Sequence, residues 1–218
     1  MESKTLHIKF FWLLFLFLAV FCTSCTRLYV NVNGYLEQNT HIEQGKRVFV
    51  FINKGIANPI LAKEIADKMQ KVLVTKGYYL ADDISNSDYV LTFAFAIDSG
   101  KPITSSSTYS YSTSSYELNI YTGQFELVPH AHTQTNISSG TMYTRNLVLT
   151  LFDSKELLVK QKANPIWIGE IVSSGSSSDL RKVLDYLIVA GFENFGEDTK
   201  GQQKYKFLEG DKRIQNLY

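Results

Sequence analysis

The chain has 218 residues and a formal net charge of +1, and both of its cysteines lie within the first 25 positions. A nearly neutral chain without clusters of basic residues argues against binding to nucleic acid. The residues after Cys25 cannot form an internal disulfide, so their hydrophobic core must suffice alone, and about 190 residues are enough for one domain.

The N-terminus has the pattern of a secretory signal peptide. Lys4 and Lys9 precede an unbroken run of twelve apolar residues, 10–21. A helix needs roughly 20 apolar residues to span a bilayer, so this run fits the apolar region of a signal better than a transmembrane helix. Removal of residues 1–24 also removes Lys4, Lys9 and Glu2 and leaves a formal net charge of zero.

The end of the apolar run, FCTSC, resembles the lipobox of bacterial lipoproteins. Thr23, Ser24 and Cys25 match that motif, whereas Cys22 stands where the motif usually has Leu. The resemblance implies that Cys25 is the lipidated first residue of the mature protein, with palmitate among its acyl chains. Plain secretion is the alternative. A redox or metal-binding C-x-x-C pair would need a folded scaffold to lower a thiol pKa, which a signal peptide does not offer.

The residues after Cys25 bear on location and on the first elements. Residues 26–28 carry neither an acidic retention signal nor an acidic export run, so the resemblance implies an outer membrane anchor facing the periplasm. We expect residues 25–45 to form a polar tether or an irregular edge segment. The short β-branched and aromatic run at 48–52 predicts a buried strand.

A helix is predicted over residues 59–76. Asn58 is a good N-cap, Pro59 suits the first helical position, and Lys76-Gly77 is a typical C-terminal signal. Apolar residues follow helical spacing along one face. The opposite, polar face is expected to carry Lys63, Glu64, Lys68 and Lys71.

Residues 89–97 predict a strand, because large and small side chains alternate along it. The large face, with Leu91, Phe93 and Phe95, is expected to meet the helices. An excursion over 100–140 follows, in which residues 104–116 are all Ser, Thr or Tyr. Such a tract favours a flexible loop, although alternating tyrosines also allow a long hairpin arm. Tyr and Ser are common on recognition surfaces, and the candidate partner-binding residues are Tyr109, Tyr111, Tyr116 and Tyr121.

The remaining chain predicts two strands and a second helix. One strand carries Leu147, Leu149 and Leu151 and ends in a turn at 153–155, and the next covers 166–172. The helix is expected to be capped by Ser178 and to end at Gly196, before a loose polar tail over 197–218. The order β-α-β, excursion, β-β-α predicts an α+β two-layer sandwich, with a mixed or antiparallel sheet and two amphipathic helices on one face.

Residues 46–196 resemble a family of small bacterial envelope lipoproteins that carry an uncharacterised domain. The matching stretches are KRVFVFI, then NPILAKEIADKMQKVLVTKGY, SDYVLTFAFAI, NLVLTLFDSKELLV and PIWIGEIVSSG. The excursion and the polar tail depart from the family pattern. The resemblance implies an envelope lipoprotein, and it brings no activity and no catalytic residues with it.

Three motifs suggest chemistry, and each has a simpler interpretation. His130 and His132 would share one face of a strand, but a zinc site needs three or four ligands. The stretch 175–179, GSSSD, resembles a serine active site, yet it also fits a strand end followed by a helix cap. Trp167 with Gly169 is best explained as core packing. We expect no metal and no cofactor.

The sequence therefore predicts a lipid-anchored envelope protein that is not an enzyme. Its partners would be the membrane, through the lipid, and another envelope protein or a glycan. The alternative is a small-ligand-binding periplasmic lipoprotein with an apolar cleft bordered by Phe93, Phe95 and Trp167. An envelope hydrolase is the third hypothesis, and it would require a polar cleft that brings Ser or His near an acid.

Overall fold

The structure is a computed structural model, which describes residues 27–53, 55–119, 124–159, 164–208, 210–215 and 217. The side chains of residues 116–119 and 124–128 are not among those described. The predicted signal peptide 1–24, Cys25 and Tyr121 therefore lie outside the described residues, and Tyr116 is described by its backbone alone.

The described strands form one mixed sheet in the order β3-β2-β4-β6-β7-β1-β8, and β5 pairs with β6 outside this order. Strand β2 is parallel to β3 and β4, and the other described pairings are antiparallel. The sheet and its helices confirm the predicted α+β class. The strands are β1 (Arg27–Leu36), β2 (Arg47–Phe51), β3 (Tyr79–Leu80), β4 (Tyr89–Ile97), β5 (Lys101–Asn119), β6 (Gln124–Asp153), β7 (Pro165–Gly175) and β8 (Gln203–Leu208).

The two predicted helices are present, with one wrong cap. The Asn58 side chain accepts a hydrogen bond from the Leu61 N–H at 3.0 Å and caps the first helix. The second begins at Arg181 without a cap from Ser178. None of the helices in the described residues is long and apolar enough to cross a membrane. The helices are α2 (Pro59–Thr75), α3 (Ser154–Val159), α4 (Arg181–Glu193) and α5 (Lys212–Gln215), with a 3₁₀ helix at Ile84–Asn86.

The predicted tether 25–45 and the predicted tail 197–218 both supply strands, so those predictions were wrong. Strand β1 lies between β7 and β8 in the sheet. Val30 and Val32 in β1 and Phe207 in β8 are fully buried. Apolar residues alternate with Asn or Lys in both segments, which is the pattern of a strand with one face in water. The predicted turn at 153–155 is also wrong, because α3 begins at Ser154.

The hydrophobic core lies between the sheet and the helices. Helix α2 contacts β2 and β3, α4 contacts β7, β1 and β6, and the two helices contact each other. In β4 the large side chains Leu91 and Phe93 are buried while Ala94 and Ala96 are exposed, as the alternation predicted. The fully buried core side chains include Ile65, Met69, Leu73, Leu147, Leu149, Leu151, Ile171 and Phe192.

A buried ion pair joins α2 to α4. The Lys68 ammonium lies 2.7 Å from the Asp185 carboxylate and 2.9 Å from Glu64, and the Lys68 and Asp185 side chains are each 11% exposed. Lys68 was predicted on the solvent face of α2, but its position at the flank of the apolar stripe turns it toward α4. A buried charge is tolerated when it is paired, and removal of one partner leaves the other uncompensated.

We expect Asp185→Ala to lower the free energy of unfolding by about 3 kcal/mol, because the Lys68 ammonium would lose its partner on α4. The matched control is Asp67→Ala, which removes the exposed Lys63–Asp67 pair and should cost about 0.5 kcal/mol or less. Urea unfolding followed by circular dichroism measures both values. Equal values for the two variants would contradict the structural role of the buried pair.

Candidate functional site

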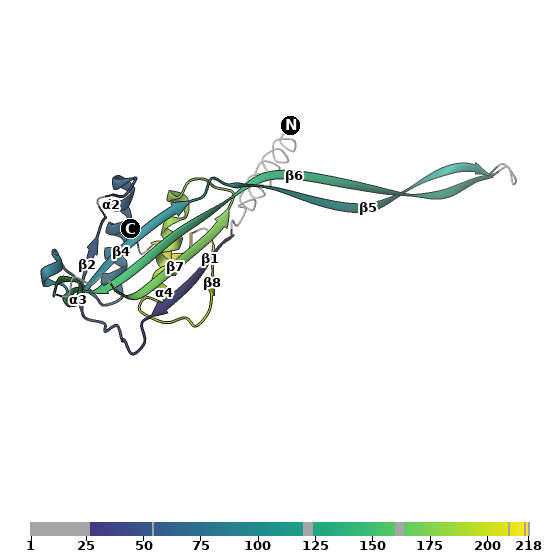
Figure 1. The fold of residues 1–218 in the computed structure, drawn as a ribbon. Helices are drawn as coiled ribbons and strands as arrows, with labels where there is room; N and C mark the ends of the chain where they lie inside the picture. Colours follow the sequence, from purple (N-terminus) through teal and green to yellow (C-terminus); the bar gives the residue numbers. More distant parts are fainter. Residues whose placement is uncertain are drawn as a thin grey trace, which may run out of the picture.

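The excursion predicted at 100–140 forms a β-hairpin, not a flexible loop. Strand β5 pairs with the outer part of β6 without interruption from Lys101↔Met142 to Asn119↔Gln124. We name residues 101–119 and 124–142 the arm. At about 3.4 Å per residue the arm is roughly 60 Å long. Figure 1 shows it extending away from the sheet.

The shaft of the arm carries no formal charge. The shaft is residues 102–116 and 127–142, which contain no Asp, Glu, Lys or Arg. The described side chains of the shaft are largely exposed and rich in hydroxyl groups. Hydroxyls bond across the two strands, with 2.6 Å between Ser105 Oγ and Ser138 Oγ and 3.0 Å between Thr108 Oγ1 and Thr135 Oγ1. The surface of the shaft is therefore polar and neutral.

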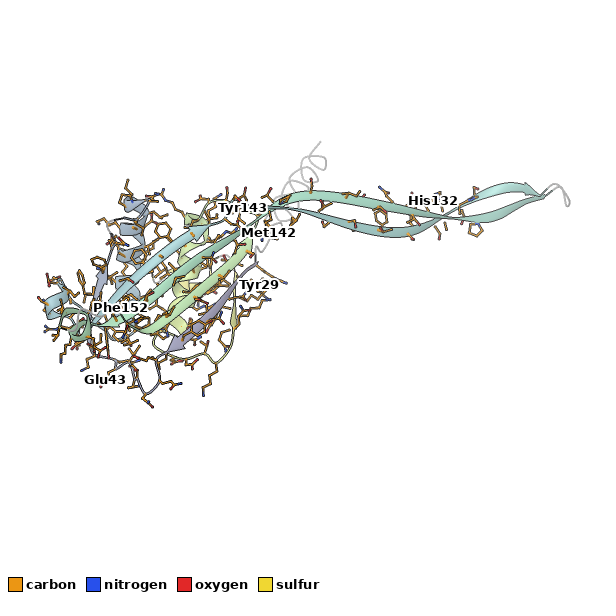
Figure 2. All side chains as sticks on the ribbon, in the orientation of Figure 1. Tyr29, Glu43, His132, Met142, Tyr143 and Phe152 are labelled. Atoms are coloured by element: carbon orange, nitrogen blue, oxygen red, sulfur yellow. The ribbon has the colours of Figure 1, made fainter. Side chains whose placement is uncertain are left out.

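One face of the arm is aromatic. The Tyr109 hydroxyl donates a hydrogen bond to Gln134 Oε1 at 2.7 Å, and the Tyr111 and His132 rings stack with centroids 5.2 Å apart. Figure 2 shows His132 on the outer part of β6. The rings of Tyr109 and Tyr111 lie 6.2 Å apart, and each residue is 46% exposed. We name Tyr109, Tyr111, His132 and Gln134 the tyrosine face.

The two arm histidines bond to hydroxyl groups. His132 Nε2 lies 2.8 Å from Thr113 Oγ1, and His130 Nε2 lies 2.8 Å from Ser115 Oγ. Within the described part of the chain, no group of three or more His, Cys, Asp or Glu side chains is placed to hold a metal ion. These contacts favour a structural role for the histidines over metal binding.

A one-residue bulge lies at the root of the arm. Ile97 pairs with Arg145, whereas the next pair is Lys101 with Met142, so three residues of one strand oppose two of the other. Asp98 Oδ1 accepts hydrogen bonds from the N–H groups of Thr144 (2.9 Å) and Gly100 (3.0 Å). These bonds, Thr144 first, lower the pKa of the Asp98 carboxyl below its ordinary value.

Gly100 is required at this bulge for two reasons. Its φ of +82° lies in the left-handed region, where other residues are strained. A Cβ at this position would lie 2.6 Å from Thr141 Cγ2 and 2.7 Å from Tyr143 Cε1. Tyr143 and Met142 mark the place where β6 leaves the sheet in Figure 2. The sequence signal was the Asp-Ser-Gly step at 98–100, because Gly within a strand pattern marks a bulge.

We name the sheet and the helices that pack on it, without the arm, the body. The residues proposed for a small-ligand cleft belong to the packed core of this body. Trp167 is 1% exposed, and its Nε1–H donates to the Glu197 carbonyl at 3.0 Å. A Cβ on Gly169 would lie 2.5 Å from the Trp167 ring, so this glycine permits close packing, as predicted. Four surface hollows of about 470 to 620 Å³ are not lined by Trp167, Phe93 or Phe95.

The serine-rich stretch 175–179 forms local hydrogen bonds. Ser177 Oγ accepts from the Asp179 N–H at 3.2 Å, and Asp179 Oδ1 accepts from the Arg181 N–H at 3.0 Å. The described contacts of this stretch thus follow the turn that leads into α4, and they do not activate a serine hydroxyl.

No protein-family model and no curated protein sequence matches the chain. Among solved structures, it is similar to a PDZ domain protein from Parabacteroides distasonis, with 14% identity and a TM-score of 0.43 over 86% of this chain and 41% of that one. The chain thus spans less than half of that protein. It is also similar to the PelC dodecamer from Paraburkholderia phytofirmans in two crystal forms. The identity is 13–14% and the TM-score is 0.41 in both comparisons. The similar regions cover 77–78% of this chain and 98–99% of PelC. Likeness of this degree carries no argument about function.

We expect Gly100→Ala to loosen the root of the arm, because alanine is strained at this φ by about 1–2 kcal/mol and its Cβ would also meet Thr141. The matched control is Gly140→Ala in the same hairpin, where the nearest atom to a new Cβ is 4.0 Å away and φ is not positive. Hydrogen exchange of the arm amides should rise roughly tenfold in the first variant and stay unchanged in the second. Unchanged exchange in both variants would contradict a strained bulge.

Proposed function

We propose that the protein is a lipid-anchored protein of the bacterial cell envelope, with a binding role and no catalytic one. In this proposal a lipid on Cys25 holds the body at the membrane, facing the periplasm from the outer membrane. The arm then contacts another envelope protein at a distance from the body. The observation that carries the proposal is the arm itself, which is long, has an uncharged shaft and is aromatic on one face.

The arm has the properties of a surface that a partner covers. A two-stranded ribbon alone in water is at best marginally stable. Natural proteins commonly protect open strand edges with charged residues, especially Lys, yet residues 102–116 carry none. A partner strand could pair with such an edge through main-chain hydrogen bonds. The tyrosine face would add rigid contact area, and the surrounding serines would add adaptable hydrogen bonds.

For the body we propose a supporting role, as a two-layer sandwich with α2 and α4 on one face of the sheet. The contact between α2 and α4 and the burial of their apolar stripes support this arrangement. A small ligand held between sheet and helices is the alternative function. The close packing of Trp167 against Gly169 and Phe195 argues against it, because a cleft there would have to open the core.

The lipid anchor makes a direct prediction. Cells that express the protein and grow with a clickable fatty acid should label the wild type and Cys22→Ala, whereas Cys25→Ala should take up no label. The reason is that Cys25 provides the thiol for the acyl group, and Cys22 would leave with the signal peptide. In-gel fluorescence after purification measures the label. Equal labelling of wild type and Cys25→Ala would refute the anchor.

The arm makes a separate prediction. A photoreactive residue at Ser110, on the arm, should capture a protein partner in intact cells, whereas one at Ile60, exposed on α2, should not. The double variant Tyr109→Ser/Tyr111→Ser should lower capture about tenfold or more, because tyrosines that a partner buries are frequent binding hot spots. The matched control is Tyr79→Ser, which removes a 65% exposed tyrosine of the body.

Mass spectrometry of the captured material identifies the partner. Capture of a glycan in place of a protein would contradict a protein partner and would identify the arm as a glycan-binding surface. Equal capture from Ser110 and Ile60, or no loss in the tyrosine double variant, would show that the arm is not the binding surface.

A further inference from the structure

A hollow of about 470 Å³ lies among β1, β7, α4 and β8, at the end of the body where β1 begins. Three cations line it, Arg27 from β1, Arg145 from β6 and Lys182 from α4, and no Asp or Glu is among the lining residues that the structure describes. The rest of the lining includes serines of the stretch 174–177 and apolar side chains.

Arg145 is a buried cation, and no carboxylate among the described residues is bonded to it. Its side chain is 1% exposed, and its Nε and Nη2 donate to the Ser177 carbonyl at 3.2 and 2.8 Å. In the residues that the structure describes, no carboxylate oxygen lies within 4 Å of its guanidinium. Burial lowers its pKa, and Asp98 opposes this through space while bonding to backbone N–H groups.

A buried charge that no described carboxylate offsets is costly. An anion bound in the hollow near Arg145 would therefore be stabilised by its positive charge. Because Arg145 is 1% exposed, its charge is less screened than that of a surface residue. Gly175 also lines the hollow, and a Cβ there would lie 3.0 Å from Arg145 Nη2 and 3.1 Å from Nη1. The absence of a side chain on Gly175 thus lets the guanidinium lie close against this part of β7.

We propose that this hollow binds a phosphate group. Lys182 and Arg27, which are exposed, contact the phosphate oxygens, and Arg145 supplies a fixed positive charge beneath them. Guanidinium and ammonium groups are the usual partners of phosphate oxygens in proteins. Binding of phosphate compounds in solution does not depend on the lipid anchor, so it can be measured separately.

The phosphate could belong to a phospholipid headgroup or be free in solution. The apolar residues Leu28, Phe207 and Leu208 in the lining suit the glycerol and first acyl carbons of a lipid. Arg27 lies two positions after Cys25 in the chain. The choice of a lipid as the source rests on the proposed anchor, which would hold this end of the body at the membrane.

Isothermal titration of the full chain in dodecyl maltoside micelles tests the site. The probes are inorganic phosphate, dihexanoyl phosphatidic acid and dihexanoyl phosphatidylcholine, whose choline offsets the phosphate charge. We expect phosphatidic acid or inorganic phosphate to bind saturably. Lys182→Gln and Arg27→Gln should each weaken this binding about tenfold, since a bond to a charged group is lost. Gly175→Val should weaken it by displacing the Arg145 guanidinium.

The matched control is Lys63→Gln, which removes the same charge from an exposed site on α2 and should bind like the wild type. Tighter binding of phosphatidic acid than of inorganic phosphate assigns the site to a lipid, and equal binding assigns it to free phosphate. The proposal is overturned if neither probe binds saturably, or if Lys63→Gln weakens binding as much as Lys182→Gln. Lipid labelling of Cys25 separates a failure here from a failure of the anchor.

Discussion

Strand β6 is the element on which the rest of the molecule depends. Its inner part pairs with β4 and β7 in the middle of the sheet, and Leu147, Leu149 and Leu151 there are fully buried. Its outer part pairs with β5 alone. A hairpin of this length would be marginal in isolation, so the arm takes its order from a strand whose other end is fixed in the core. Body and arm therefore share one continuous strand, β6.

The parts of the fold that local patterns determine were predictable. Asn58 and Pro59 start α2 because capping and the proline φ act within one turn, and the alternation in β4 separates Leu91 and Phe93 from the exposed alanines. Gly169 beside Trp167 was also explained correctly by packing. In each case the residues that decide the structure are close together in the sequence.

The failures have a different cause. In strands β1 and β8 apolar residues alternate with Asn or Lys, but what orders these segments is the pairing of β1 with β7 and β8, far away in the chain. Lys68 is buried because Asp185, 117 positions away, provides its partner. The arm was expected as a loop because Ser and Thr bury little apolar surface, and the ordering effect of β6 is not visible in the Ser/Thr/Tyr tract. The cations of the hollow come from β1, β6 and α4, and no local motif joins them.

The bulge at residues 98–100 determines the direction in which the arm leaves the sheet. Its joint is made of hydrogen-bonded backbone and a glycine, not of a flexible linker. For an arm of roughly 60 Å, a change of about 10° at the joint displaces the far end by about 10 Å. The direction of the described part of the arm is thus set by a few atoms at residues 98–100.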